Sequence, residues 1–145
     1  MITAALMLVL LMQEPQTPVA QASDTRLGLV SGDASVSRWL SEPVEIEPGV
    51  WRVWWWTFLH PPAESDGMSR AAFLHEVHCR TGQLSQGRYE LYADDRILRG
   101  YDRDLPLHQP VAHWADPEIM ERVCGDGRSE VVVPDAAAAA AHFHH

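Results

Sequence analysis

Histidine, cysteine and aspartate side chains are the groups in this sequence that could do chemistry, and their spacing limits what they could do. His75, His78 and Cys79 lie close together in the chain. A metal site needs three or four converging ligands. In an extended strand, however, His75 and Cys79 share one face while His78 points the other way. We therefore interpret this cluster as structural and expect no bound cofactor.

The C-terminal residues offer a second way to hold a metal ion. His142, His144 and His145 follow six consecutive alanines. Accessible imidazoles bind copper, nickel or zinc, so an alternative function is metal handling by these three histidines together with His60 or His113. The segment 135–145 has too little apolar bulk to pack, and we predict a flexible tail or a frayed helix.

Paired carboxylates occur at Asp94-Asp95 and at Asp102-x-Asp104. Acid–base catalysis needs carboxyl groups that face each other across a cleft. These pairs lie in predicted turns, where aspartate forms local hydrogen bonds. The sequence contains no nucleophile elbow, phosphate-binding loop, dinucleotide fingerprint or His-Glu-x-x-His motif. We predict a protein that is not an enzyme; a small hydrolase built on the acidic turns is the weaker alternative.

The most unusual feature is a tryptophan-rich segment at 50–59, whose alternation predicts a long strand. One face of this strand carries Arg52, Trp54, Trp56 and Phe58. Exposed tryptophan and arginine dominate many binding surfaces. We predict that this face binds a protein partner or a second copy of the chain in a homodimer. The alternative is that these aromatic side chains fill a core.

The sequence of the N-terminus predicts the cellular compartment of the protein. Residues 2–12 are almost wholly apolar, and this run is too short for a membrane span, which needs roughly 20 residues. Ala20-Gln21-Ala22 has the small-x-small form of a signal cleavage site, which would release a chain beginning at Ser23. Since no cysteine precedes Cys79, we expect no lipid anchor through this segment. We predict a signal peptide at 1–22 and a periplasmic or secreted protein. A buried N-terminal helix and an uncleaved anchor are the alternatives.

The composition of the chain excludes further classes of function. The 145 residues carry a formal net charge of -9, and all eleven basic residues are arginine. Nucleic-acid binding and docking on anionic lipid both need a basic surface, so we exclude these classes. A hydrophobic fraction of 46% with six tryptophans is typical of a folded domain rather than a disordered chain. We therefore expect one folded domain at 23–134, with no integral membrane segment in the mature chain.

Alternating patterns and turn residues predict mostly strands. The predicted strands lie at 26–30, 35–40, 44–47, 50–59, 69–80, 88–92, 97–101 and 130–133. One helix begins near Asp116, a good N-cap, with Pro117 at its first position and Gly125 as its C-cap. We predict an α+β fold: an antiparallel sheet of about five to six strands with one C-terminal helix packed on it.

Two cysteines in an oxidising compartment suggest one covalent link. If the chain is exported, Cys79 and Cys124 are the only pair that can form an intramolecular disulfide. Because the bond would restrict the unfolded chain, it would stabilise the folded state by about 4 kcal/mol. Such a bond would hold the predicted helix against the predicted strand at 69–80. Two buried free thiols are the alternative.

The order of these landmarks resembles a known family. A Trp-rich strand at 51–58 is followed by Glu-x-x-Cys at 76–79, a Tyr-bearing strand at 88–92 and a closing Trp-x-x-Pro helix ending in Val-Cys at 114–124. The stretch 27–125 is in this respect similar to the surface-adhesin protein E family of exported Gram-negative proteins. The resemblance implies an antiparallel sheet covered by a C-terminal helix, a Cys79–Cys124 disulfide and dimer formation. The chain departs from the family pattern because it lacks a lipobox cysteine, so we do not extend the family's surface anchoring or adhesin role to it. We predict an exported, non-catalytic binding or envelope-interaction module.

Overall fold

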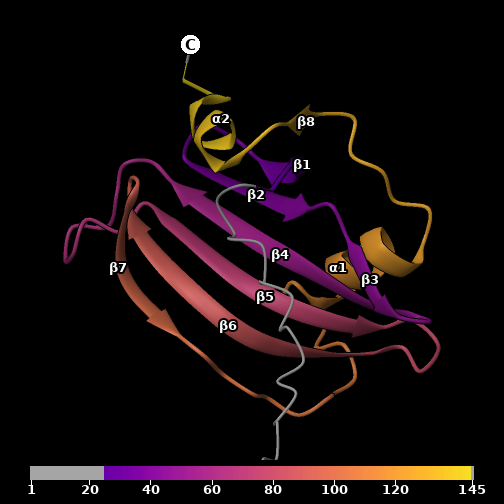
Figure 1. Cartoon of the computed structure of the whole chain (residues 1–145). Helices are drawn as coiled ribbons and strands as arrows, with labels where there is room; N and C mark the ends of the chain where they lie inside the picture. Colours follow the sequence, from indigo (N-terminus) through magenta and orange to yellow (C-terminus); the bar gives the residue numbers. More distant parts are fainter. Residues whose placement is uncertain (1–24, 145) are drawn as a thin grey trace, which may run out of the picture.

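A computed structural model describes residues 25–144 of the chain, so the predicted signal peptide, Ser23 and His145 lie outside the described residues. Eight strands form a single antiparallel sheet in the order β7-β6-β5-β4-β2-β1-β8, with β3 pairing on β4 (Figure 1). The strands are β1 Leu27–Gly32, β2 Val36–Ser41, β3 Val44–Glu47, β4 Val50–Leu59, β5 Arg70–His78, β6 Gln83–Ala93, β7 Arg96–Tyr101 and β8 Val132–Val133. The helices are α1 Asp116–Cys124 and α2 Ala136–Ala141. The α+β prediction is confirmed, although the sheet has more strands than the five or six expected.

Strand β4 lies at the centre of the sheet and pairs with three other strands. On one side it pairs with β5 from Val50↔His78 to Phe58↔Arg70. On the other side it pairs with β2 along its second half and with β3 along its first. Where the chain passes from β2 to β3, the backbone N–H of Trp54 donates to the Ser41 hydroxyl at 2.8 Å. A side chain thus satisfies a buried donor that would otherwise be left without a partner.

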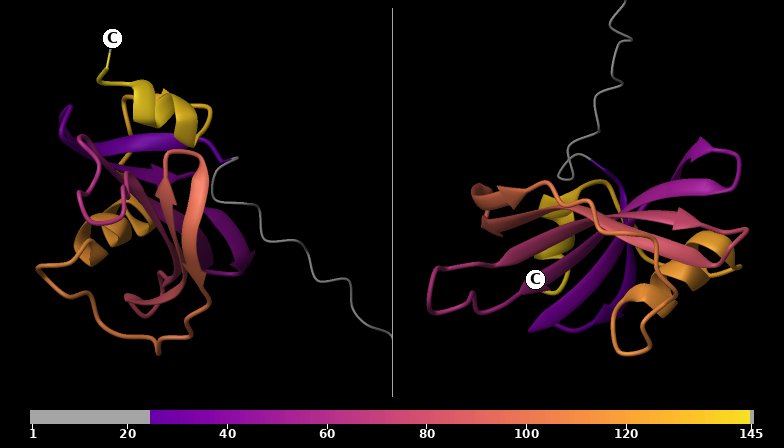
Figure 2. Two further views of the ribbon diagram at one scale, coloured as in Figure 1. Left: turned by 90° about the vertical axis from the view of Figure 1, so that its left-hand side faces the viewer. Right: turned by 90° about the horizontal axis from the view of Figure 1, so that it is seen from below.

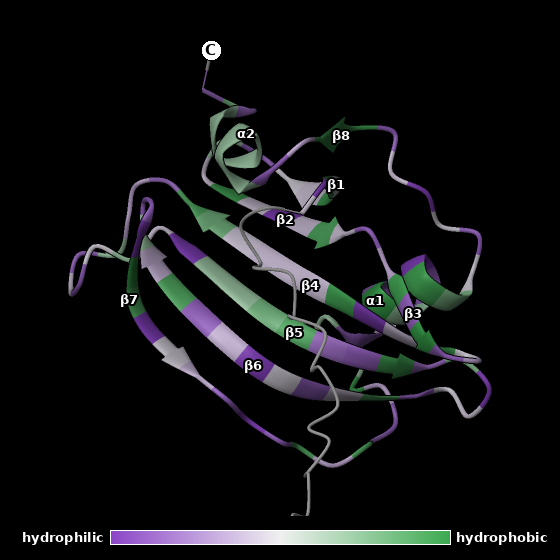
Figure 3. Cartoon of the chain, in the orientation of Figure 1, coloured by the Kyte–Doolittle hydropathy of each residue, from purple (hydrophilic) through white to green (hydrophobic). Residues whose placement is uncertain are grey.

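The two helices pack on opposite faces of the sheet, near opposite ends of β4 (Figure 2). Because side chains alternate along a strand, β4 contributes to both faces, and its green segments in Figure 3 mark part of this apolar material. The core under α1 contains Leu40, Val53, Trp55, Val77, Leu84 and Ile119. The core under α2 contains Leu27, Trp39, Trp54, Trp56, Phe58, Ala72, Ala136 and Ala139.

Helix α1 forms where its sequence predicts, but its two ends differ from the prediction. Ala115 occupies the N-cap position, without a side-chain capping bond, and Asp116 is the first helical residue. Asp116 is buried because its carboxylate makes tertiary contacts instead. Gly125 ends the helix in extended backbone, with φ -96° and ψ -162°, rather than in the left-handed region. Its N–H still donates to the Glu121 carbonyl at 3.0 Å, so the last turn closes without a left-handed cap.

The C-terminal segment is not the loose tail that its composition predicts. Residues Ala136–Ala141 form α2, and the Asp135 carboxylate caps it by accepting from the Ala138 N–H at 2.8 Å. Ala136 and Ala139 are fully buried in the core. The small alanine side chains let this short helix lie close to the aromatic face of the sheet. The helix therefore packs although it has no large apolar side chains.

Strand β6 is longer than predicted. The sequence predicts this strand only at 88–92, whereas β6 begins at Gln83, and Leu84 is completely buried. Leu84 forms a two-way backbone bridge with His108, at 3.0 and 2.9 Å. The segment that follows β7 therefore runs back along β6 and leads into α1.

Candidate functional site

The predicted partner-binding face is covered. Trp54, Trp56 and Phe58 are 5%, 1% and 6% exposed and belong to the core under α2. Only Arg52, farther along β4, is exposed, and it forms an ion pair of 3.7 Å with Glu76. These three aromatic side chains fill a core, as in the alternative interpretation, because the segment predicted to be a loose tail lies on them.

The covered face is a stack of aromatic rings. Trp56 lies between Phe58 and Tyr92, with ring centroids 5.5 and 5.6 Å away. Trp39 donates from its indole N–H to the Ser37 hydroxyl at 2.9 Å. The Nε1 of Trp56 is the one buried side-chain polar atom among the described residues that has no hydrogen-bond partner. This stack is a hydrophobic core with one unpaired donor.

A buried polar cluster joins α1 to the sheet on the other face. The Asp116 carboxylate accepts from His108 Nε2 at 2.9 Å and from the Val111 backbone N–H at 3.0 Å. Nearby, His75 Nδ1 donates to the Phe73 carbonyl at 3.2 Å. Asp116 lies in the first turn of α1, where negative charge is favourable. These contacts fix the start of the helix and explain why a carboxylate is buried there.

Burial sets the charge of His75. Removal from water lowers the pKa of His75 to about 4, while the Phe73 carbonyl and the Asp116 charge oppose this shift. The ring is therefore neutral at neutral pH and cannot exchange protons there as a general acid or base does. His75, His78 and Cys79 do not converge on one point: His78 pairs with Glu76 at 2.9 Å, and Cys79 is bonded to Cys124.

The predicted disulfide is present. Cys79 and Cys124 are bonded, with their Cα atoms 5.4 Å apart. Cys79 follows β5 and Cys124 ends α1, so the bond ties the helix to the sheet. Among the described residues there is no free cysteine. A thiol is therefore available neither for catalysis nor for metal binding in this state of the protein.

An uncovered surface on the same side of the sheet as α1 was missed by the sequence analysis. Phe73 stacks on Tyr89 at 5.9 Å, and Tyr89 lies 5.1 Å from Tyr101. The guanidinium groups of Arg103 and Arg99 lie 5.8 Å from the rings of Tyr89 and Tyr101. We call these five residues the aromatic–arginine surface. Only the register of β5, β6 and β7 brings them together, because they are spread over three strands and the following loop.

The aromatic–arginine surface is chemically different from the covered stack. Tyr101 is 46% exposed, whereas Phe73 and Tyr89 are half-buried. Arg99 and Arg103 are also exposed and form no ion pair with a described residue. Exposed tyrosine beside unpaired arginine can pack on apolar groups and accept a carboxylate at the same time. This composition allows apolar contacts and ion pairs on one surface.

The paired carboxylates lie in ion pairs and turns. Asp102 accepts from Arg88 at 3.0 Å, and Arg88 also binds Glu90 at 2.7 Å; both contacts raise the pKa of Arg88. Tyr92 donates its hydroxyl hydrogen to Glu90, and burial together with this bond raises its pKa. Asp95 pairs with Arg70 at 3.0 Å. Asp95 is thus paired with Arg70, while Asp102 and Glu90 share Arg88.

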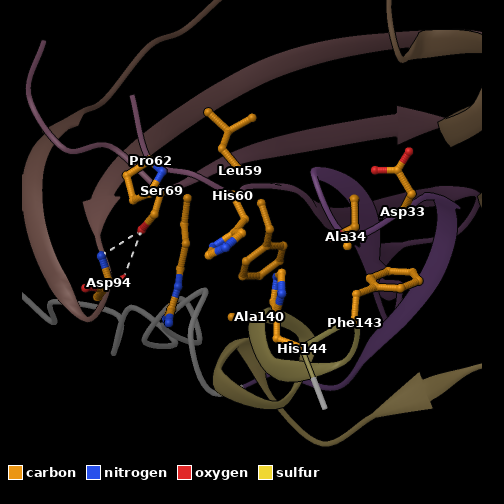
Figure 4. A pocket seen from close by; sticks show the side chains of 13 residues that line it. Asp33, Ala34, Leu59, His60, Pro62, Ser69, Asp94, Ala140, Phe143 and His144 are labelled. Carbon is orange, nitrogen blue, oxygen red and sulfur yellow. Dashed lines mark hydrogen bonds between the residues drawn. The ribbon is translucent and has the colours of Figure 1, made fainter. Parts of the chain in front are cut away.

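A small cavity opens at the end of β4, beside the C-terminus of α2 (Figure 4). Its volume is about 100 Å³, and Asp33, Ser69, Arg70, His60 and His144 are among its lining residues. The imidazole rings of His60 and His144 lie 4.3 Å apart, tilted by 48°. The sequence analysis named both residues for metal binding. His142, named with them, instead packs edge-on against Trp39 at 5.4 Å.

Comparison of the chain with family models, curated proteins and solved structures gives no match. Within residues 25–144, no three His, Cys, Asp or Glu side chains converge in a way that could hold a metal ion. No helix in that part of the chain is long and apolar enough to cross a membrane. The function must therefore be argued from the surfaces of this chain alone.

Proposed function

We propose that this chain is an exported, non-catalytic binding module of the cell envelope, of the type of the surface-adhesin protein E family. We propose further that it binds a protein partner through the aromatic–arginine surface. The observation that carries the proposal is the row of rings from the half-buried Phe73 and Tyr89 to the exposed Tyr101, flanked by two exposed arginines that form no ion pair within residues 25–144. Tyrosine and arginine are enriched at the energetic centres of protein interfaces.

The charge of the surface indicates the chemistry of the partner. The chain carries a net charge of -9, yet this surface presents Arg99 and Arg103. Each guanidinium can form a bidentate pair with a carboxylate, and Tyr101 can pack on an apolar side chain beside it. An acidic segment with aromatic or aliphatic residues fits this surface best. The Cys79–Cys124 bond supports the export part of the proposal, because disulfides persist in oxidising compartments.

Site-specific photo-cross-linking in the native host tests the binding surface. A photoreactive amino acid at position 101 should form an adduct of discrete mass with a partner protein. The same amino acid at position 44, which is 61% exposed at the other end of the sheet, should not. The double substitution Arg99→Glu and Arg103→Glu should abolish the adduct at position 101 while circular dichroism stays unchanged. The same adducts at both positions, or none at 101 in folded exported protein, would contradict the proposed surface.

Intact-mass spectrometry of the protein from its native host tests export separately. The proposal requires a mass that begins at Ser23 and rises by two hydrogens on reduction of the Cys79–Cys124 bond. An unprocessed chain in the cytosol would contradict the proposal that the protein acts in the cell envelope. The cross-linking result would then still decide whether the aromatic–arginine surface binds a protein.

A further inference from the structure

We infer that His60 and His144 together form a binding site for a divalent transition-metal ion, most favourably Cu²⁺, and that the bound ion clamps α2 on the sheet. This inference is independent of the proposed protein-binding surface. His60 follows β4, and His144 follows α2, so the two residues are 84 positions apart in the chain (144 − 60). Figure 4 shows the labelled pair where the end of β4 meets α2.

The backbone holds both histidines in place. The N–H of His60 donates to the Ser35 carbonyl at 2.9 Å, and the N–H of His144 donates to the Ala141 carbonyl at 3.0 Å. Their ring centroids lie 4.3 Å apart. With metal–nitrogen bonds of about 2.0 Å, two imidazoles in neighbouring positions on one ion have centroids about 4.4 Å apart. The observed separation therefore matches two neighbouring ligands of a single ion.

The surroundings favour a cation and allow its entry. Both imidazoles are exposed, so an ion reaches them from solvent. Asp33 and Asp94 are among the residues that line the same cavity, as is Arg70, which is paired with Asp95. Three hydrogen bonds from Ser35 and Val36 lower the pKa of Asp33, which keeps its negative charge in place. The cavity wall thus combines two ligands with fixed negative charge.

The number of protein ligands at this site determines which metal ion it binds best. No third described donor converges with the pair, so water would complete the coordination. A closed tetrahedral zinc site needs four protein ligands. Among divalent first-row ions, Cu²⁺ forms the strongest complexes with imidazole. The pair is therefore an open two-imidazole site that takes Cu²⁺ in preference to Zn²⁺ or Ni²⁺.

A bridging ion has a structural consequence. It joins the end of β4 to the residues directly after α2, and α2 covers Trp54 and Trp56. Because the pair is assembled only in the folded state, the ion binds that state in preference and stabilises it. Copper would thus hold the cover on the aromatic stack, where no covalent bond does so.

Thermal unfolding of the disulfide-bonded chain with CuCl₂ in a non-chelating buffer tests this inference. We expect Cu²⁺ to raise the melting temperature and to give an electron paramagnetic resonance spectrum with two nitrogen ligands. His60→Gln and His144→Gln should each weaken binding by about tenfold or more, since even indirect ligand partners contribute 10- to 100-fold. His113→Gln, an exposed histidine at the α1 end, is the matched control and should change nothing.

His60→Gln separates this site from binding by the C-terminal histidines alone. Binding that survives His60→Gln would show that the terminal histidines suffice and would overturn the inference. Binding without a rise in melting temperature would overturn the clamp. Melting temperatures of the variants without metal are measured in parallel, and because both side chains are exposed, we expect them to match that of the unsubstituted chain.

Discussion

Helices α1 and α2 cover opposite faces of the same central strand, but they are fastened in different ways. Helix α1 is held by the Cys79–Cys124 disulfide, by the buried Asp116 carboxylate and by Ile119 in the core. Helix α2 has none of these links. It is held by Ala136 and Ala139 against the rings of the sheet and by the Asp135 cap.

The difference shows how apolar bulk can be divided between a helix and a sheet. Under α1 both elements contribute large side chains, such as Ile119 and Trp55. Under α2 the sheet contributes nearly all of the large side chains. The helix contributes small alanine side chains, which let it lie close to the sheet. Alanine buries little area of its own, so α2 gains stability mainly by covering aromatic surface. We therefore expect α2 to open locally at a lower free energy than α1.

Truncating the aromatic stack should have the largest effect. Trp56→Ala removes a side chain that is 1% exposed, so we expect a loss of about 4 kcal/mol in the free energy of unfolding. Urea denaturation followed by circular dichroism measures it. Trp114→Ala, at a position 54% exposed, is the control and should change stability by less than about 0.5 kcal/mol. Equal losses would mean that the stack under α2 is no core.

Removing the disulfide would test the contrast between the two helices directly. Cys79→Ala with Cys124→Ala should cost about 3 to 4 kcal/mol, because the unfolded chain gains entropy. Hydrogen exchange should then speed up in α1 relative to the amides of α2. If both helices lost protection equally, the two covers would form one cooperative unit, and the contrast between them would fail.

Acid should destabilise the α1 face through His75. Its pKa is about 4 in the folded protein, against 6.5 ordinarily, so the unfolded chain takes up the proton first. The stabilising contribution is complete above pH 6.5 and is lost as the pH falls towards 4, by about 3 kcal/mol. Urea denaturation between pH 7.5 and pH 4 measures this slope. His75→Gln should flatten it, and an unchanged slope would assign the loss to other groups.

The smallest effect concerns the start of α2. Asp135→Ala removes the acceptor for the Ala138 N–H and should cost about 1 kcal/mol. Asp135→Asn retains a capping oxygen and should lose much less. Hydrogen exchange at Ala138 and Ala139 reports the change at the helix itself. Equal exchange in both variants would show that the cap does not hold α2.

Local patterns were enough to predict most of the strands and the disulfide that holds α1. Alternation over 50–59 correctly predicted the central strand and its two apolar faces. The cysteines at 79 and 124 could be paired because the chain offers no other partner. Both inferences use information that lies within one segment or in a single pair of residues, which is why the sequence alone sufficed.

The candidate site depended on contacts between distant segments, which a single sequence does not reveal. Whether Trp54 and Trp56 bind a partner or fill a core depended on what lies on them, and six alanines gave no hydrophobic pattern that would indicate a cover. Likewise Phe73, Tyr89 and Tyr101 meet only through strand register. A bulge between Phe73 and His75 also shifts the pairing of β5 with β6, which alternation does not encode.

The pairing of β1 with β8 has a consequence for how the chain reaches its folded state. Leu27 pairs with Val133, and the Leu29 N–H donates to the Val131 carbonyl at 2.9 Å, so the two ends of the domain close one edge of the sheet. Synthesis proceeds from the N-terminus, so β1 can pair with β2 early, but its other edge stays unpaired until β8 has been made. Until α2 emerges, Trp54, Trp56 and Phe58 lack their cover. From the time that β4 is made until α2 follows, the nascent protein therefore exposes an aromatic face, which favours aggregation during that interval.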